Sequence, residues 1–77
     1  MMQITDEELL GYFKKFESEF NTMAEIHKFL LTEKRKCTIE ELRSRILNLY
    51  KDGYVGKEVT GDGVNLYYLL FNPDVTE

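Results

Sequence analysis

Apolar residues recur every three or four positions in three stretches of the chain, a spacing typical of amphipathic helices. The pattern predicts helices over residues 5–19, 23–32 and 38–52. We expect the first to turn Leu9, Phe13, Phe16 and Phe20 to the core, the second Met23, Ile26, Leu30 and Leu31, and the third Ile39, Leu42, Ile46, Leu49 and Tyr50.

Each predicted helix begins with the same polar motif, a threonine followed three residues later by a glutamate. The pairs are Thr5 with Glu8, Thr22 with Glu25, and Thr38 with Glu41. In such a capping box, each side chain bonds the backbone N–H of the other residue, which satisfies two donors that a helix start leaves without partners. Three matches, each opening an apolar-periodic run, predict three helix starts. Gly53 supplies a left-handed stop for the third helix.

A β-hairpin is predicted directly after this glycine. Residues 54–59 read as a strand, Thr60-Gly61-Asp62-Gly63 as a turn, and Val64 to Phe71 as the return strand. Alternate positions of the return strand are apolar on both faces. The strand is therefore either covered on both sides within one molecule or half exposed and suited to a partner. Residues 72–77 are expected to form a flexible tail.

The order helix, helix, helix, glycine, hairpin resembles the winged helix-turn-helix superfamily, from about Thr5 to Phe71. The segment that carries the resemblance reads Leu42-x-x-x-Ile46-x-x-Leu49-x-x-x-Gly53-Tyr54-Val55, followed by a return strand containing Leu66-Tyr67-Tyr68-Leu69. The resemblance implies an α+β fold: a small winged helix-turn-helix with three helices and a two-stranded β-hairpin wing. We expect residues 1–77 to form a single domain.

The net charge of −4 is unevenly distributed. Residues 1–22 hold five acids and two bases (−3), residues 23–52 five acids and seven bases (+2), and residues 53–77 four acids and one base (−3). Because nucleic-acid contact depends on local Lys and Arg, the acidic total argues against nucleic-acid binding without excluding it.

The resemblance implies that the third helix, residues 38–52, lies in the major groove of double-stranded DNA. Arg suits guanine and Asn suits adenine, whereas Lys and Arg before the helix suit phosphates. The candidate contacts are Arg43, Ser44, Leu47, Asn48 and Lys51 on the helix, Lys34, Arg35 and Lys36 before it, and Lys57 on the wing. The function expected is that of a small transcriptional regulator. The wing departs from the pattern, since Glu58 and Asp62 oppose Lys57 there.

Three alternatives stay open. The basic helix face and loop are equally typical of solvated surfaces. The acidic total and the apolar strand favour a protein-interaction subunit or adaptor that never touches nucleic acid. A homodimer through Val64–Phe71 is a separate hypothesis and is not one of these three alternatives. RNA binding on the same basic third is the weakest of the three.

The sequence predicts no enzyme, no cofactor and no metal site. His27 and Cys37 are the only imidazole and thiol, and they have no third partner. We interpret His27 as a histidine at the edge of the core. A lone cysteine favours a reducing compartment, and the longest apolar run, Leu66 to Phe71, is far shorter than the roughly 20 residues of a membrane span. We therefore expect a cytoplasmic protein with no membrane partner.

Overall fold

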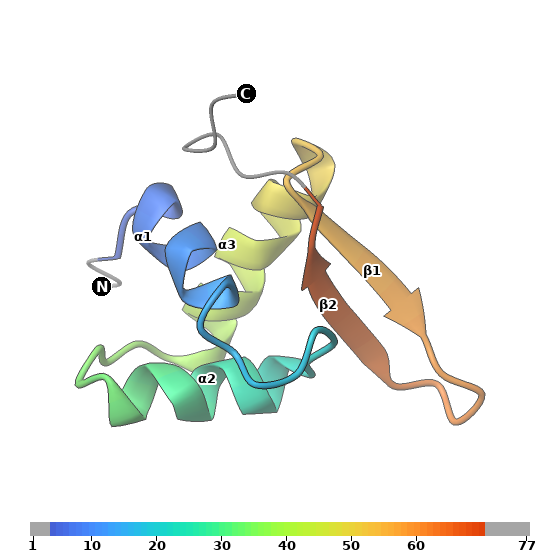
Figure 1. Ribbon diagram of the computed structural model, residues 1–77, viewed down its shortest axis with the longest axis horizontal. Helices are drawn as coiled ribbons and strands as arrows, with labels where there is room; N and C mark the ends of the chain where they lie inside the picture. Colours follow the sequence, from blue (N-terminus) through green and yellow to red (C-terminus); the bar gives the residue numbers. More distant parts are fainter. Residues whose placement is uncertain (1–3, 71–77) are drawn as a thin grey trace.

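The computed structural model describes residues 4–70 and consists of three helices followed by a β-hairpin (Figure 1). The elements are α1 (Asp6–Phe13), α2 (Met23–Thr32), α3 (Ile39–Lys51), β1 (Val55–Val59) and β2 (Asn65–Leu69). The predicted α+β architecture is confirmed. None of the helices in residues 4–70 is long and apolar enough to cross a membrane. Phe71 and residues 72–77 lie outside the described part of the chain.

All three predicted helix starts are confirmed, each with a complete capping box. At α1, for example, the Thr5 hydroxyl accepts a 3.1 Å bond from the Glu8 N–H, and the Glu8 carboxylate accepts a 3.0 Å bond from the Thr5 N–H.

The predicted end of the first helix at residue 19 is wrong, since α1 ends at Phe13. The Lys14 N–H turns to the carbonyl of Gly11, three residues back, which tightens the last turn. Phe16 then packs its ring on Phe13, at 5.1 Å, and on Phe29 of α2, at 4.9 Å. Aromatic packing between elements has overridden the helical spacing of the sequence.

Helices α2 and α3 end in the same way, with a residue in the left-handed region. After α3, Gly53 has φ +86°, and the Tyr54 N–H donates to the Leu49 carbonyl at 3.0 Å, as in a Schellman motif. After α2, the left-handed residue is Lys34, with φ +61°, and the Arg35 N–H donates to the Leu30 carbonyl at 2.8 Å. The sequence indicates the first stop, at a glycine, but not the second.

The hairpin is antiparallel, with Val55 opposite Leu69 and Val59 opposite Asn65. The connection between α1 and α2 adds one more rung to it. The Asn21 N–H donates to the Tyr67 carbonyl at 3.1 Å, and the Tyr67 N–H donates to the Asn21 carbonyl at 2.8 Å. This rung covers the middle of the outer edge of β2 and ties the hairpin to the helices.

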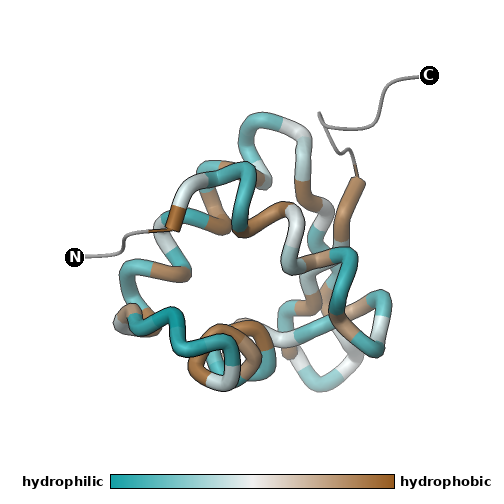
Figure 2. Tube along the Cα trace, turned by 60° about the vertical axis from the view of Figure 1, so that its left-hand side comes forward, coloured by the Kyte–Doolittle hydropathy of each residue, from teal (hydrophilic) through white to brown (hydrophobic). Residues whose placement is uncertain are grey.

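The core draws on every element, and hydrophobic and hydrophilic positions alternate along the helices (Figure 2). Its buried apolar residues are Ile4, Leu9, Leu10, Phe13, Ile26, Leu30, Leu42, Ile46, Leu49, Val55 and Tyr67. Three residues predicted to face inward are exposed instead: Phe20, Leu31 and Tyr50. The ammonium group of Lys57 lies over the exposed Tyr50 ring, 5.0 Å from the ring centroid, as in a cation–π contact.

Candidate functional site

Helix α3 has one buried face and one exposed face, as its apolar periodicity predicts. The buried face packs against α2 and β1 through Leu42, Ile46 and Leu49. The exposed residues among the candidates are Arg43, Ser44, Asn48 and Lys51, whereas Leu47 is half-buried. Since 3.6 residues make a turn, Arg43, Leu47 and Lys51 form one row along the helix, with Ser44 and Asn48 beside it.

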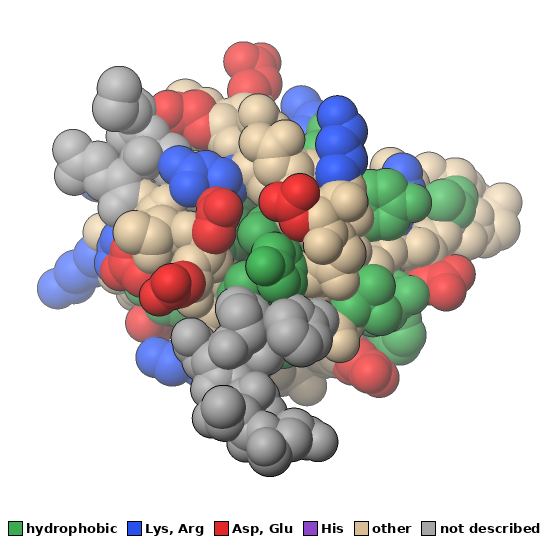
Figure 3. All heavy atoms as spheres, turned by 90° about the horizontal axis from the view of Figure 1, so that it is seen from above, with side chains coloured by type: hydrophobic (Ala, Val, Ile, Leu, Met, Phe, Trp, Pro, Cys, Tyr) green, Lys and Arg blue, Asp and Glu red, His purple; other side chains and the backbone are tan. Residues whose placement is uncertain are grey.

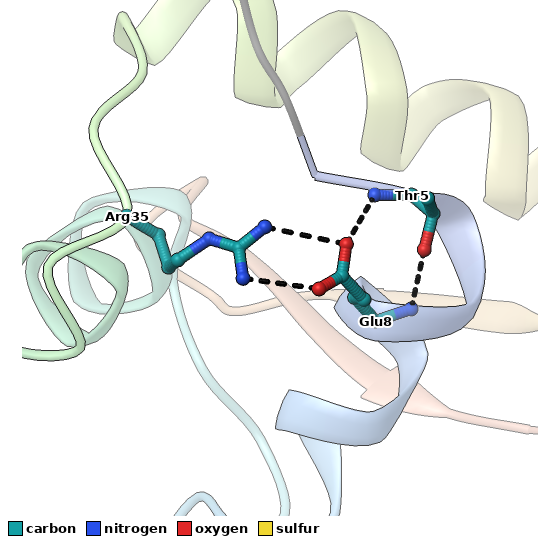
Figure 4. Close-up of polar contacts among 3 residues, drawn as sticks. All are labelled: Thr5, Glu8 and Arg35. Carbon is teal, nitrogen blue, oxygen red and sulfur yellow. Dashed lines mark hydrogen bonds and ion pairs between the residues drawn. The ribbon is translucent and has the colours of Figure 1, made fainter.

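Some cations of the basic third are engaged within the molecule. The guanidinium of Arg35 donates to both carboxylate oxygens of Glu8, at 3.0 and 3.2 Å (Figure 4). Arg45 forms an ion pair of 2.9 Å with Asp6. The predicted phosphate contact Arg35 is therefore a link between the α2–α3 connection and the start of α1. Lys57 likewise lies over Tyr50.

The geometry around Glu8 shifts the acidity of both partners. The hydrogen bonds from Arg35, and after them the backbone N–H of Thr5, lower the pKa of Glu8 from 4.5 to about 2. The hydrogen bonds to the same carboxylate raise the pKa of Arg35 above its usual value. Glu8 is thus ionised at neutral pH and completes both a helix cap and a bidentate pair.

The other cations among the candidates face solvent. Arg43, Lys51, Lys34 and Lys36 are exposed, and none forms an ion pair within residues 4–70. Arg43 and Lys51 are the two on α3, eight positions apart, so about two helical turns separate them on the same side. The exposed side of α3 therefore presents two uncommitted cations together with the hydroxyl of Ser44 and the amide of Asn48.

A groove of about 310 Å³ runs beside Arg43, between the start of α2, the start of α3 and the start of β2. Its lining includes Thr22 and Ala24 on one side and Asn65, an exposed residue, on the other. The sequence did not identify Asn65 as a candidate contact, because no local pattern places it beside Arg43, which lies 22 positions earlier in the chain. One signal was present: Asn65 is the only side chain with a polar amide in the otherwise apolar stretch 64–71.

Some of the acidic residues close to α3 accept hydrogen bonds in the capping boxes. The Glu41 carboxylate accepts a hydrogen bond from the Thr38 N–H at 2.9 Å. This bond is the main reason why the pKa of Glu41 is lowered. Glu25 caps α2 in the same way, at 2.8 Å. Glu40 is exposed and keeps a negative charge at the start of α3.

His27 and Cys37 lie close together but do not form a reactive pair. The Nε2 atom of His27 is 2.7 Å from the backbone carbonyl oxygen of Cys37, so this contact holds the α2–α3 connection. Burial, and then the charge of Glu41, raise the pKa of the Cys37 thiol, the opposite of what activates a nucleophile. Within residues 4–70 no group of three or more His, Cys, Asp or Glu side chains could hold a metal ion.

Three helices packed around one core, with a two-stranded hairpin after the third, define a winged helix-turn-helix domain. A crystal structure of the ferric uptake regulator (Fur) of Vibrio cholerae, described as revealing a structural rearrangement of the DNA-binding domains, has a similar fold. The TM-score is 0.78 and the identity 14%, with 92% of this chain and 56% of the Fur chain covered. This chain therefore spans just over half the length of that protein. No protein-family model and no curated protein matches the sequence.

Proposed function

We propose that the protein binds double-stranded DNA through the exposed side of α3 and acts as a small cytoplasmic transcriptional regulator. One observation carries the proposal. Arg43 and Lys51 are exposed on the same side of α3 without an ion-pair partner in residues 4–70, whereas Arg35 and Arg45 are held by carboxylates. Within residues 4–70, the cations held by carboxylates tie elements of the fold together, and the two exposed on α3 stay available for a ligand.

Each side chain on that face has chemistry suited to a part of duplex DNA. Arg43 can bond the O6 and N7 atoms of guanine, and Asn48 the N6 and N7 atoms of adenine. Ser44 can bond either type of base, while half-buried Leu47 offers apolar contact. Lys51 can bond guanine or a phosphate oxygen. Lys34 and Lys36, in the connection before α3, would add phosphate contacts that set the register.

Two predicted contacts have a smaller part in this proposal. Arg35 would have to leave Glu8 to bind a phosphate directly, and Lys57 would have to leave the Tyr50 ring. The Fur structure supports the proposal, since it shares this fold and is described as having DNA-binding domains.

The experiment is fluorescence anisotropy with mixed-sequence duplex DNA at low and moderate salt, with an RNA hairpin as competitor. DNA binding through this face predicts an affinity that falls steeply with salt, because phosphate neutralisation releases counterions. The duplex should outcompete the RNA hairpin. Absence of binding at low salt would remove the proposal and leave the protein-interaction alternative.

Matched variants locate the face. Arg43→Ala should relax base preference at one position and weaken binding by about 1–3 kcal/mol, the usual value of a bidentate base contact. Lys14→Ala removes one positive charge from an exposed residue just after α1 and should leave preference unchanged. Equal effects of the two variants would mean that binding depends on overall charge and that α3 is not the reading head.

The homodimer through Val64–Phe71 stays a prediction. Asn21 occupies the edge of β2 at Tyr67, and Tyr67 belongs to the core. A second copy would therefore meet the alternate side chains Leu66, Tyr68 and Leu70. Light scattering at high protein concentration tests this directly, and a monomeric mass would end the hypothesis.

A further inference from the structure

The hairpin has an apolar face that points away from the core. Side chains alternate along a strand, so Leu66 and Tyr68 share a face opposite to that of buried Tyr67, and Leu70 continues their row. Phe20, from the α1–α2 connection, packs on this face. We call Phe20, Leu66, Tyr68 and Leu70 the outer patch. Phe20 is 41% and Leu70 59% exposed, while the other two are half-buried.

Contacts within the outer patch hold its aromatic rings in place. Phe20 and Tyr68 stack edge to face, with ring centroids 5.1 Å apart and an interplanar angle of 63°. The end of the Tyr68 ring also lies against Gly56 on the neighbouring strand, where any side-chain carbon would collide with it. Rings fixed in this way lose little conformational freedom on binding, which is a property of residues that anchor interfaces.

One acid stands beside the outer patch in the hairpin register, and two more come close to it in sequence. Glu58 stands opposite Leu66 in the hairpin register, and Glu17 and Glu19 come just before Phe20 in the chain. All three are exposed, and none forms an ion pair within residues 4–70. Figure 3 shows hydrophobic and acidic side chains next to each other over the hairpin end of the molecule.

Charge favours a basic partner over a second copy of the chain on this face. A second copy would bring its own Glu58 to the same face, and like charges across an interface cost free energy. The chain's own residues 71–77 carry two acids and no base, so their charge also does not complement Glu58. We propose that the outer patch binds a segment of another protein in which apolar anchors are flanked by Lys or Arg.

This proposal does not depend on DNA binding, since the outer patch and the exposed side of α3 share no residue. The opposite charge of the two surfaces separates their ligands further. Arg43 and Lys51 suit a polyanion, whereas the border of the outer patch repels one. A single domain could then hold DNA on one side and a basic protein segment on the other.

The test uses a synthetic amphipathic peptide of leucine and lysine, titrated into the ¹⁵N-labelled full chain and followed by NMR. A peptide of the same pattern with glutamate in place of lysine is the charge control. We expect the lysine peptide to shift amides around Phe20, Glu58 and Leu70, and the glutamate peptide to shift none. Binding of both peptides alike, or shifts centred elsewhere, would overturn the proposal.

Two exposed leucines provide a matched pair of variants. Leu70→Ser should weaken the lysine peptide about tenfold, the effect of losing one anchoring side chain. Leu31→Ser, on α2 and 48% exposed, should change its affinity less than about twofold. Equal weakening would show that the peptide responds to net charge or general hydrophobicity and would refute the assignment.

A third variant guards against loss of folding in Leu70→Ser. Glu58→Lys keeps the apolar residues and reverses one border charge, so it should weaken the lysine peptide and strengthen the glutamate peptide. Unchanged affinities would contradict the role of the acids. Shifts of the outer patch with protein concentration alone, in the absence of peptide, would assign the face to a second copy of the chain and overturn the proposal.

Discussion

Arg35 and Glu8 lie 27 residues apart in sequence and join through two hydrogen bonds, at 3.0 and 3.2 Å. One oxygen of that carboxylate also accepts the Thr5 N–H, so Glu8 caps α1 and anchors the α2–α3 connection at the same time (Figure 4). The pair fixes the connection that leads into α3. A residue type that suggests phosphate binding thus contributes to the placement of α3.

Acid should weaken this link in a defined range of pH. The folded-state pKa of Glu8, about 2, lies below its ordinary value of 4.5. The stability that the ionised carboxylate contributes is therefore fully present above pH 4.5 and is lost as the pH falls towards 2. Glu8→Gln keeps a side chain able to complete the capping box but removes the charge.

We expect Glu8→Gln to be less stable than the wild type at pH 7, with a difference that shrinks between pH 4.5 and 2. Urea denaturation at a series of pH values measures it. Glu7→Gln removes a neighbouring carboxylate with no ion pair in residues 4–70 and should show a smaller difference at pH 7. A constant difference for Glu8→Gln over the whole range would contradict the ion pair.

Lys34, also in the α2–α3 connection, has a strained backbone conformation. Its φ of +61° costs a residue with a side chain roughly 1–2 kcal/mol, whereas glycine adopts this conformation freely. Glycine also loses more entropy on folding, by roughly 0.5–1 kcal/mol. Lys34→Gly should therefore stabilise the fold by about 0.5–1 kcal/mol in urea denaturation.

Lys36→Gly serves as the control for this effect. It removes the same charge from the same connection, at a residue without a positive φ. It should destabilise the protein by roughly 0.5–1 kcal/mol. Both variants should weaken duplex binding to a similar extent, since each removes one candidate phosphate contact. A loss of stability in Lys34→Gly as large as in Lys36→Gly would show that position 34 carries no left-handed strain.

The parts of the fold that the sequence predicts depend on local chemistry. The three capping boxes join residues three positions apart, and the stop at Gly53 depends on one residue's conformation, so each can be recognised in the sequence alone. The end of α1 depends on Phe16 packing against Phe29, and no local pattern shows that contact. Local rules therefore located the helix starts better than their ends.

The same distinction applies to the candidate site. Helical periodicity predicts which residues of α3 are exposed, and Arg43, Ser44, Asn48 and Lys51 are exposed as expected. Periodicity does not show which cations have partners. Arg45 meets Asp6 from 39 residues away, and only the tertiary fold brings the two side chains together.

Gly56 tests the internal order of the outer patch. A side-chain carbon at this buried position would collide with the end of the Tyr68 ring. The ring would have to move and would lose its stacking on Phe20. Gly56→Ala should therefore cost about 1–3 kcal/mol, as overpacking typically does.

A second substitution separates overpacking from other causes. In Gly56→Ala combined with Tyr68→Ala, the collision is absent, so the glycine substitution should cost much less than it does alone. Gly61→Ala, at a turn position with open space around it, should be close to neutral. Urea denaturation of the wild type, the double variant and the single variants Gly56→Ala, Tyr68→Ala and Gly61→Ala gives the free energies of unfolding that are compared. An undiminished cost in the double variant would place the strain in the backbone.

Asn65 is the residue through which the groove can extend the proposed DNA-binding face. It lies with Arg43 on the lining of one groove, and its amide matches the edge of adenine. Asn65→Ala should weaken a preferred duplex by about 1–3 kcal/mol and leave mixed-sequence DNA less affected. Ser18→Ala, at an exposed polar position in the α1–α2 connection, is the control and should change neither affinity.

A double-mutant cycle with Arg43→Ala tests whether the two side chains act together. If both read neighbouring base edges across the groove, the loss in the double variant should differ from the sum of the single losses by more than about 0.5 kcal/mol. Strict additivity would mean that Asn65 contacts the duplex independently of Arg43. If the wild type binds the duplex and Asn65→Ala has no effect, the proposed DNA-binding face is restricted to α3. If the wild type binds no duplex, the proposal of DNA binding itself is refuted.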